Sequence, residues 1–220
     1  MLELPIAEIK HTAWTADVYE PSDDTFLLVD ALQQDVVTWS DFSNGAPTVL
    51  ELGCGSGYVS CSLALMMQHM CMRAQMLAVD HSCAAVEATR QTLQNHKVDH
   101  VVEVIQSDLT RSLHSNLVGH VDLLVFNPPY VPTPDSEVHL QGVASAWAGG
   151  HKGRRVIDRL LPQLRGLLSP RGIVYMVTVS ENDPGGIVQD MQSQGFQGRV
   201  LMSRQADEEF LSIVRLQAQW

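Results

Sequence analysis

Asn127, Pro128, Pro129 and Tyr130 are the residues of this chain whose types and order are most suited to chemistry, and we call them the NPPY loop. They follow an apolar run, residues 121–126, that predicts a buried strand. Because proline has no N–H for a sheet ladder and disfavours a helical conformation in the preceding residue, the strand must end in a stiff loop. The Asn127 side-chain oxygen and the Pro128 carbonyl could each accept an N–H of a planar NH₂ group, while the Tyr130 ring covers its flat face. We therefore predict Asn127, Pro128 and Tyr130 as catalytic residues, and Asn127, Pro129 and Tyr130 as substrate-binding residues.

A glycine-rich turn upstream predicts a site for a nucleotide-like cofactor. Residues 48–52 predict a strand, and Gly53, Gly55 and Gly57 follow it before an apolar-periodic segment. Glycines in a strand-to-helix turn of this kind let the backbone approach a ligand closely, so we expect all three to contact the cofactor. The dinucleotide fingerprint requires its third glycine one place later, where this chain has Tyr58, and this disfavours NAD or FAD.

Acidic residues follow two further predicted strands. The strand at 76–79 ends in Asp80, which is placed to take ribose hydroxyls. The strand at 101–106 leads to Asp108 and Leu109, which could accept from an adenine amino group and pack on its ring. An acid at a strand end is often a simple strand terminator. The glycine turn, the two acids and the NPPY loop, in order on four strand ends, nevertheless predict an S-adenosylmethionine-dependent N-methyltransferase.

The alternation of strands and helices predicts one α/β domain. We expect a single Rossmann-like class I methyltransferase domain over residues 18–220, preceded by an arm of residues 1–17 that is either flexible or docked. Its sheet should be mainly parallel and doubly wound, with a terminal antiparallel strand. Residues 135–153 read as an irregular substrate-side segment around Trp147-Ala148-Gly149-Gly150. Other expected strands cover 173–179 and 210–216. The first expected helix starts at residue 21 with Ser22 as its cap. Further helices are expected over 59–70, 82–95, 154–168 and 187–194.

Composition narrows the class of partner. The 220 residues carry a net charge of −11 and a pI of about 5.1, whereas proteins that bind nucleic acid by themselves usually show a basic patch. The four cysteines contain no C-x-x-C pair, so we expect reduced thiols and no metal site. Neither a signal peptide nor a membrane-spanning run is visible. We expect a cytoplasmic and nuclear protein that contacts neither membranes nor nucleic acid directly.

The chain resembles the short eukaryotic branch of the HemK-type protein-glutamine N5-methyltransferases, closely enough to suggest an orthologue. The resemblance covers nearly the whole chain from Asp17 onward. It rests on four segments: 18–26 (VYEPSDDTF), 124–131 (LVFNPPYV), 146–150 (AWAGG) and 168–172 (LSPRG). The resemblance implies that S-adenosyl-L-methionine is the cofactor and that Asn127 also holds the target amide. It implies cofactor contacts by Thr25, Glu51, Gly53, Asp80, Asp108, Leu109 and Asn127. It also implies that Tyr19 lies near the site, and we expect Tyr19 to bind the cofactor as well.

The resemblance also implies a substrate and a partner. Members of this branch methylate the glutamine of the Gly-Gly-Gln motif in a class I translation release factor. They work as heterodimers with a small zinc-binding activator protein, which covers an apolar sheet edge near the cofactor site. The strand at 76–79 could lie near such an edge.

Three alternatives stay open from the sequence. Animal members of the branch are credited with methylating a histone lysine, but a lysine with a reference pKa of ~10.4 must first lose a proton, so the neutral Asn127 favours an amide or base NH₂. The NPPY loop would also fit the amino group of adenine (N6) or cytosine in nucleic acid, against which the acidic charge counts. A cofactor-binding regulatory subunit without turnover is the third reading.

Overall fold

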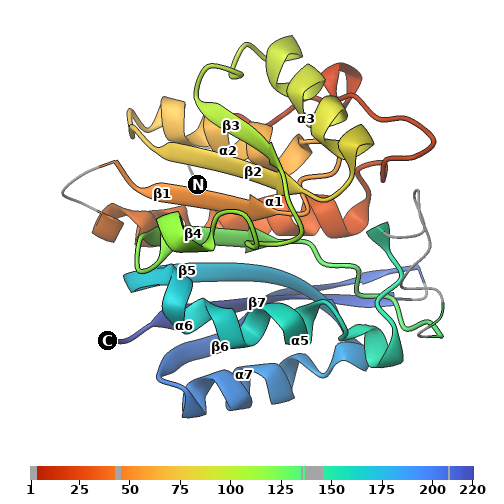
Figure 1. Ribbon diagram of the computed structural model, residues 1–220, viewed down its shortest axis with the longest axis vertical. Helices are drawn as coiled ribbons and strands as arrows, with labels where there is room; N and C mark the ends of the chain where they lie inside the picture. Colours follow the sequence, from red (N-terminus) through yellow and green to blue (C-terminus); the bar gives the residue numbers. More distant parts are fainter. Residues whose placement is uncertain (1–3, 43–45, 135, 137–145, 208) are drawn as a thin grey trace.

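A seven-stranded sheet forms the centre of the computed structural model, which describes residues 4–42, 46–134, 136, 146–207 and 209–220. Its strand order is β3-β2-β1-β4-β5-β7-β6 (Figure 1). Strands β1 to β5 are parallel, and β7 runs antiparallel to both β5 and β6. This confirms the expected α/β fold and the antiparallel strand at its end. The strands are β1 (Thr48–Leu52), β2 (Gln75–Asp80), β3 (Val102–Gln106), β4 (Val121–Phe126), β5 (Leu168–Val179), β6 (Phe196–Ala206) and β7 (Glu209–Ala218).

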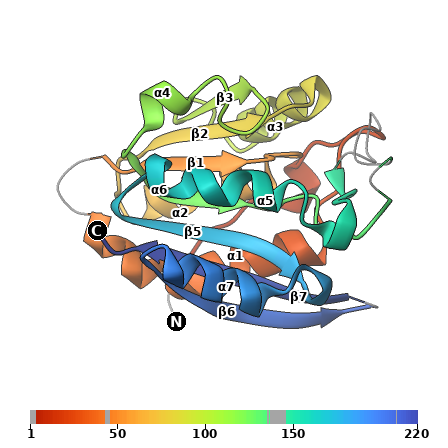
Figure 2. The same cartoon turned by 60° about the horizontal axis from the view of Figure 1, so that its bottom comes forward.

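Helices cover both faces of the sheet. Successive strand residues point to opposite faces, so Val49 belongs to one hydrophobic core and Leu50 to the other. The first core is closed mainly by α1 and α2, and the second by α5, α6 and α7, which lie together in front of the sheet in Figure 2. Burial on both faces explains why the central strands are almost continuously apolar. The helices are α1 (Asp23–Asp35), α2 (Tyr58–His69), α3 (Cys83–Asn95), α4 (His114–Leu117), α5 (Ile157–Leu160), α6 (Leu164–Leu167) and α7 (Pro184–Ser193), and 3₁₀ turns include η2 (Val36–Phe42), η5 (Leu161–Gln163) and η6 (Ser180–Asn182).

The prediction of a single helix over residues 154–168 is wrong. The segment consists of α5, the 3₁₀ turn η5 and α6, and Pro162 lies at the start of η5. Proline cannot donate the hydrogen bond that would continue a regular helix at that position. The following strand also begins earlier than expected, since Leu168 already pairs with Val121, and residues 169–172 form an irregularity before Ile173 resumes the register.

Two further expectations concern local structure. Strand β2 lies next to an edge of the sheet, as expected, since it pairs with β1 on one side and with β3 on the other; β3 and β6 are the outer strands. Ser22 lies at the N-cap position of α1, but its side chain makes no capping hydrogen bond. Only its carbonyl participates, as the acceptor for the Phe26 N–H at 2.9 Å.

The described part of the N-terminal arm is docked. Leu4 and Ala7 are buried, the Ala7 N–H donates to Ser62 Oγ of α2 at 3.1 Å, and the Ala13 N–H donates to Thr92 Oγ1 of α3 at 2.8 Å.

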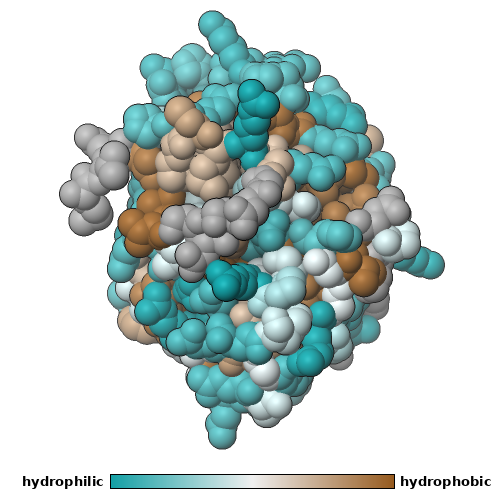
Figure 3. Space-filling model, turned by 90° about the vertical axis from the view of Figure 1, so that its left-hand side faces the viewer, coloured by the Kyte–Doolittle hydropathy of each residue, from teal (hydrophilic) through white to brown (hydrophobic). Residues whose placement is uncertain are grey.

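Figure 3 shows the side of the molecule on which the parallel strands begin, where hydrophobic groups form separate patches among hydrophilic residues. None of the helices in the described ranges combines the length and apolar character needed to cross a bilayer.

Candidate active site

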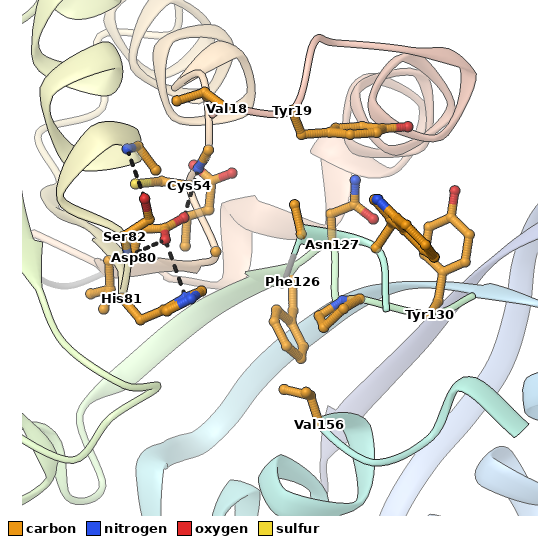
Figure 4. A pocket seen from close by; sticks show the side chains of 18 of the residues that line it. Val18, Tyr19, Cys54, Asp80, His81, Ser82, Phe126, Asn127, Tyr130 and Val156 are labelled. Carbon is orange, nitrogen blue, oxygen red and sulfur yellow. Dashed lines mark hydrogen bonds and ion pairs between the residues drawn. The ribbon is translucent and has the colours of Figure 1, made fainter. Parts of the chain in front are cut away.

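A cavity of about 870 Å³ lies at the C-terminal ends of strands β1 to β4. Between β1 and β4 the strand order reverses direction, and in an open parallel sheet this is where ligands bind. Its volume falls in the range of small-molecule sites. Figure 4 shows Cys54, Asp80, His81 and Ser82 on one side of the cavity and Tyr19, Asn127 and Tyr130 on the other. Of the predicted site residues, the cavity is lined by Tyr19, Thr25, Glu51, Gly53, Gly55, Asp80, Asp108, Leu109, Asn127, Pro129 and Tyr130.

The three glycines of the turn after β1 have two different roles. Gly53 and Gly55 line the cavity with φ values of +68° and +52°, a conformation that side chains rarely adopt. Gly57 does not line it, although we expected cofactor contact there. It precedes α2 with φ +77°, and a Cβ would lie 2.8 Å from the Thr89 backbone, so its position is explained by the packing of α2 against α3.

The carboxylate of Asp80 holds the glycine turn and faces the cavity. Its Oδ2 accepts from the Gly55 N–H at 3.0 Å, and its Oδ1 accepts from the Ser82 N–H at 2.9 Å. Each carboxylate oxygen has a second lone pair, so the group can still accept from ligand hydroxyls. Asp108 and Leu109 also line the cavity, where Asp108 makes a 2.6 Å ion pair with Arg159 of α5.

Glu51 is a buried carboxyl group at the end of β1. Its side chain accepts a hydrogen bond from the Ser60 hydroxyl of α2, and only 3% of the residue is exposed. Burial raises the pKa of Glu51 to about 8, with the Asp80 carboxylate adding to the shift and the Ser60 hydrogen bond opposing it. A large fraction of this carboxyl group therefore carries its proton near neutral pH.

The NPPY loop meets the start of α1 through Asp24. The Asn127 Nδ2 group donates to Asp24 Oδ2 at 2.9 Å, which turns Oδ1 of Asn127 the other way. Among the described residues, Asn127 Oδ1 is a buried side-chain oxygen without a hydrogen-bond partner. Asp24 is 3% exposed and also accepts from the hydroxyl groups of Tyr130 at 3.2 Å and Tyr19 at 3.3 Å. The site therefore presents one acceptor oxygen in a fixed direction.

Burial and nearby carboxylates keep the two tyrosines protonated. Burial is the main cause that raises the pKa of Tyr130 far above its ordinary value, and the charges of Asp24 and Glu209 add to it. Burial and Asp24 likewise raise the pKa of Tyr19. The Tyr130 hydroxyl lies 3.4 Å from Glu209 Oε2 as well, so it stands between two carboxyl groups.

The segment 146–153 supports the NPPY loop from behind. Val131 forms an isolated parallel bridge with Ala148, and the Gly149 N–H donates to the Val131 carbonyl at 2.8 Å. Gly153, at φ +66°, packs so closely that a Cβ would lie 1.7 Å from the Tyr130 carbonyl oxygen. Asn182 is fully buried and donates to the carbonyls of Tyr130 at 2.9 Å and Lys152 at 2.8 Å. Trp147, 37% exposed, lines the cavity, while Pro128 is buried and does not. The rest of the expected substrate-side segment, 135 and 137–145, lies outside the described residues.

Three residues of this site were missed by reasoning from the sequence: Asp24, Asn182 and Glu209. Asp24 stands in the run Ser22-Asp23-Asp24-Thr25, which a helix start explains without any other role. Asn182 and Glu209 stand in no motif. Only their position in the fold reveals them, since each contacts the NPPY loop from a distant part of the chain.

The fold and the cavity together define a class I S-adenosylmethionine-dependent methyltransferase. The chemistry of the side chains fits such a cofactor: a glycine turn allows close approach, and the Asp80 carboxylate can take hydroxyl groups. When bound, this cofactor supplies a methyl group made electrophilic by a sulfonium.

Comparison with known proteins agrees with this class. The sequence matches the family "Methyltransferase small domain" over residues 23–143. "Methyltransferase HEMK2" of Mus musculus is 47% identical over 199 residues, which is 90% of this chain and 89% of that protein. "eRF1 methyltransferase catalytic subunit mtq2" of Schizosaccharomyces pombe is 34% identical over 229 residues, 98% of this chain and 96% of that protein. In a structure of the E. cuniculi Mtq2-Trm112 complex, described as methylating the eRF1 translation termination factor, a chain that is 24% identical shares the fold with a TM-score of 0.63 over 92% of this chain and 99% of that one. The chain belongs to the methyltransferase small domain family, and it is an S-adenosylmethionine-dependent enzyme of the HemK type.

Proposed function

We propose that this enzyme methylates the side-chain nitrogen N5 of the glutamine in the Gly-Gly-Gln motif of a class I translation release factor. The proposal rests on Oδ1 of Asn127, a buried oxygen with no hydrogen-bond partner in the described part of the chain. Its direction is fixed by the bond from Nδ2 to Asp24. A neutral amide oxygen suits a neutral amide NH₂, whereas a lysine ammonium would have to lose a proton before it could attack. The names of the relatives from fission yeast and E. cuniculi, which mention eRF1, support the same substrate.

The residues of the site would act mainly by positioning. Asn127 Oδ1 accepts one N–H of the substrate amide and aims the nitrogen lone pair into the cavity. Proximity of this kind lowers the barrier without a strong base. The Pro128 carbonyl, which we predicted as a second acceptor, belongs to a residue outside the cavity lining. Positive charge grows on the nitrogen as the new bond forms, and the fixed dipole of the Asn127 amide stabilises it. Asp24 contributes by holding the Asn127 amide in the required orientation.

We further propose that the enzyme works as the catalytic subunit of a heterodimer with a small activator protein, expected to bind zinc. The names of the fission-yeast relative, a "catalytic subunit", and of the Mtq2-Trm112 complex support a partner. The described sheet ends on one side at β3, beside Asp108 and the cofactor end of the cavity. An outer strand offers unpaired backbone groups to a second chain, so β3 rather than β2 is the edge that we assign to the partner.

Transfer of a labelled methyl group tests the proposal. The co-expressed heterodimer is incubated with intact release factor and with a variant in which the glutamine of the motif is alanine. We expect label on the first protein and background label on the second. Equal labelling of both proteins, or labelling of histone or DNA but not of the release factor, would contradict the proposed substrate. Asn127→Ala serves as the enzyme control, since it should still bind the cofactor but not transfer the methyl group.

A further inference from the structure

Glu209 is a carboxyl group that the positioning mechanism leaves without a role. It stands at the start of β7, half-buried, and lines the cavity on the same side as Tyr130. Its Oε2 lies 3.4 Å from the Tyr130 hydroxyl, which also donates toward Asp24 at 3.2 Å. A tyrosine hydroxyl has one proton and two lone pairs, so it can pass a proton to one neighbour while it accepts a proton from another.

The reaction requires a destination for one proton. An amide nitrogen that has gained a methyl group carries a positive charge until it loses an N–H proton. No histidine or lysine lines the cavity near the NPPY loop in the described part of the chain, so carboxyl groups are the available acceptors.

Of the two carboxylates beside the Tyr130 hydroxyl, Asp24 and Glu209, Asp24 is the less suitable proton acceptor. Besides Tyr130, it already accepts from the Thr25 N–H at 2.6 Å, from Thr25 Oγ1 at 3.1 Å and from Asn127 Nδ2 at 2.9 Å. Protonation of Asp24 would disturb the bond that orients Asn127. At 3% exposed, it also has little contact with water through which the proton could leave.

Glu209 has both a suitable environment and an exit. Partial burial raises its pKa, the hydrogen bond from Tyr130 opposes this shift, and the charges of Asp24 and Glu181 add to it. Because the net shift is upward, Glu209 takes up a proton more readily than an ordinary glutamate. It also lines a second, more open hollow of about 700 Å³, through which a proton can reach solvent. The titratable groups that line this hollow with Glu209 are Tyr19, Asp23, Tyr130 and Asp207.

We propose that Glu209 receives, through the Tyr130 hydroxyl, the proton that the acceptor nitrogen loses when it is methylated. The inference rests on the proposed function in requiring an N–H acceptor. The nitrogen lone pair forms the new N–C bond while the electrons of the S–C bond stay on sulfur. The N–H proton moves to the Tyr130 oxygen as the Tyr130 proton moves to Glu209 Oε2, which then releases it to the second hollow. Glu209 thus acts through Tyr130 as a positioning and proton-accepting residue.

Single-turnover rates against pH test this inference on the heterodimer. Glu209→Gln keeps the size of the side chain but cannot take up the proton. We expect it to lower the rate about 10- to 100-fold near neutral pH and to remove the limb of the pH–rate profile that follows deprotonation of Glu209, with cofactor affinity changed less than about twofold. Glu209→Asp, which keeps a carboxyl group, should retain the limb with an intermediate rate.

Asp207→Asn is the matched control. Asp207 lies on the same hairpin and in the same hollow, has a positive φ that asparagine tolerates, and should lose less than about twofold in rate. A wild-type rate and profile in Glu209→Gln would overturn the inference, as would an equal loss in Asp207→Asn or equal behaviour of the Gln and Asp variants. The wild-type rate on the release factor tests the proposed function separately, because the ratio of variant to wild type can be measured with any N–H acceptor that the enzyme methylates.

Discussion

Asp24 and Asn127, 103 residues apart in the chain, are joined by a 2.9 Å hydrogen bond from the asparagine Nδ2 group to the buried carboxylate. This bond decides which atom of the asparagine faces the cavity. With Nδ2 held by Asp24, the carbonyl oxygen Oδ1 is the atom left to accept a substrate N–H. A side chain on the first turn of α1 thereby sets the function of a loop at the end of β4.

Asp24→Ala should abolish the fixed orientation of the Asn127 amide. The Asn127 amide would then be free to rotate, and its NH₂ group would face the substrate in part of the molecules. We expect the single-turnover rate to fall about 100-fold, as when an oriented group is removed from an active site, with cofactor affinity within about threefold of wild type. Stopped reactions with labelled cofactor and binding titrations measure the two quantities. Asp23→Ala is the control, since Asp23 is exposed and adjacent. Equal rate losses in both variants would show that Asp24 does not act through Asn127.

Asp80→Asn should affect cofactor binding more than turnover. The carboxylate organises the glycine turn through the Gly55 N–H and is expected to take the ribose hydroxyls. Hydrogen bonds to a charged group contribute about 1.5–3 kcal/mol, so the dissociation constant should rise about 10- to 100-fold. Isothermal titration of the cofactor measures this change. Glu87→Gln, on the exposed surface of α3, should leave the affinity unchanged, and an unaltered affinity in Asp80→Asn would exclude Asp80 from the cofactor site.

Glu51 should make the stability of the cofactor-free protein depend on pH. Its pKa is about 8 in the folded protein and has an ordinary value of 4.5, so between these values the folded state holds more protons than the unfolded state. The contribution of Glu51 to the free energy of unfolding is therefore complete below about pH 4.5 and is lost as the pH rises toward about 8. In Glu51→Gln this dependence disappears. The free energy of unfolding of wild type relative to Glu51→Gln should fall by up to about 1.4 kcal/mol per pH unit in this window. Urea denaturation at three pH values measures it, and parallel curves for the two proteins would contradict the burial of an uncharged Glu51.

Gly153→Ala should displace the NPPY loop. The added methyl group would lie 1.7 Å from the Tyr130 carbonyl oxygen, at a backbone φ of +66°. We expect a loss of about 1–3 kcal/mol in the free energy of unfolding, together with a lower methylation rate. Gly166→Ala, in α6 with open space around the added atom, should instead be neutral or stabilising by about 0.5–1 kcal/mol. Unfolding curves of the two variants compare the sites, and similar curves would contradict the tight contact at Gly153.

The strand ends could be predicted from the sequence because their signals are local. An apolar run followed by glycines, an acid or two prolines marks where each strand stops, and parallel strands bring those ends to one edge of the sheet. The positions of Asp80 and Asn127 in one cavity followed from this reasoning. The broken helix at Pro162 had a local signal as well, and the expectation of one continuous helix gave that proline too little weight.

The contacts around the NPPY loop had no local signal. Asp24, Asn182 and Glu209 reach it across separations of 103, 52 and 79 residues to their partners Asn127, Tyr130 and Tyr130. An aspartate in the first turn of a helix and an asparagine in a short turn each have an ordinary local explanation. The edge position of β3 likewise depends on the order of strands in space, which the sequence order β1, β2, β3 leaves open.

The most direct test of the account is to locate the methyl group on the substrate. Intact release factor, treated with the heterodimer and cofactor, is digested and sequenced by tandem mass spectrometry, with Asn127→Ala enzyme in parallel. We expect one methyl group on the side-chain nitrogen of the glutamine in the Gly-Gly-Gln motif with wild-type enzyme. With Asn127→Ala we expect an unmodified peptide, although that variant still binds the cofactor. A methyl group on a lysine or at another position, or full modification by Asn127→Ala, would contradict the claim that Asn127 presents a glutamine amide to the cofactor.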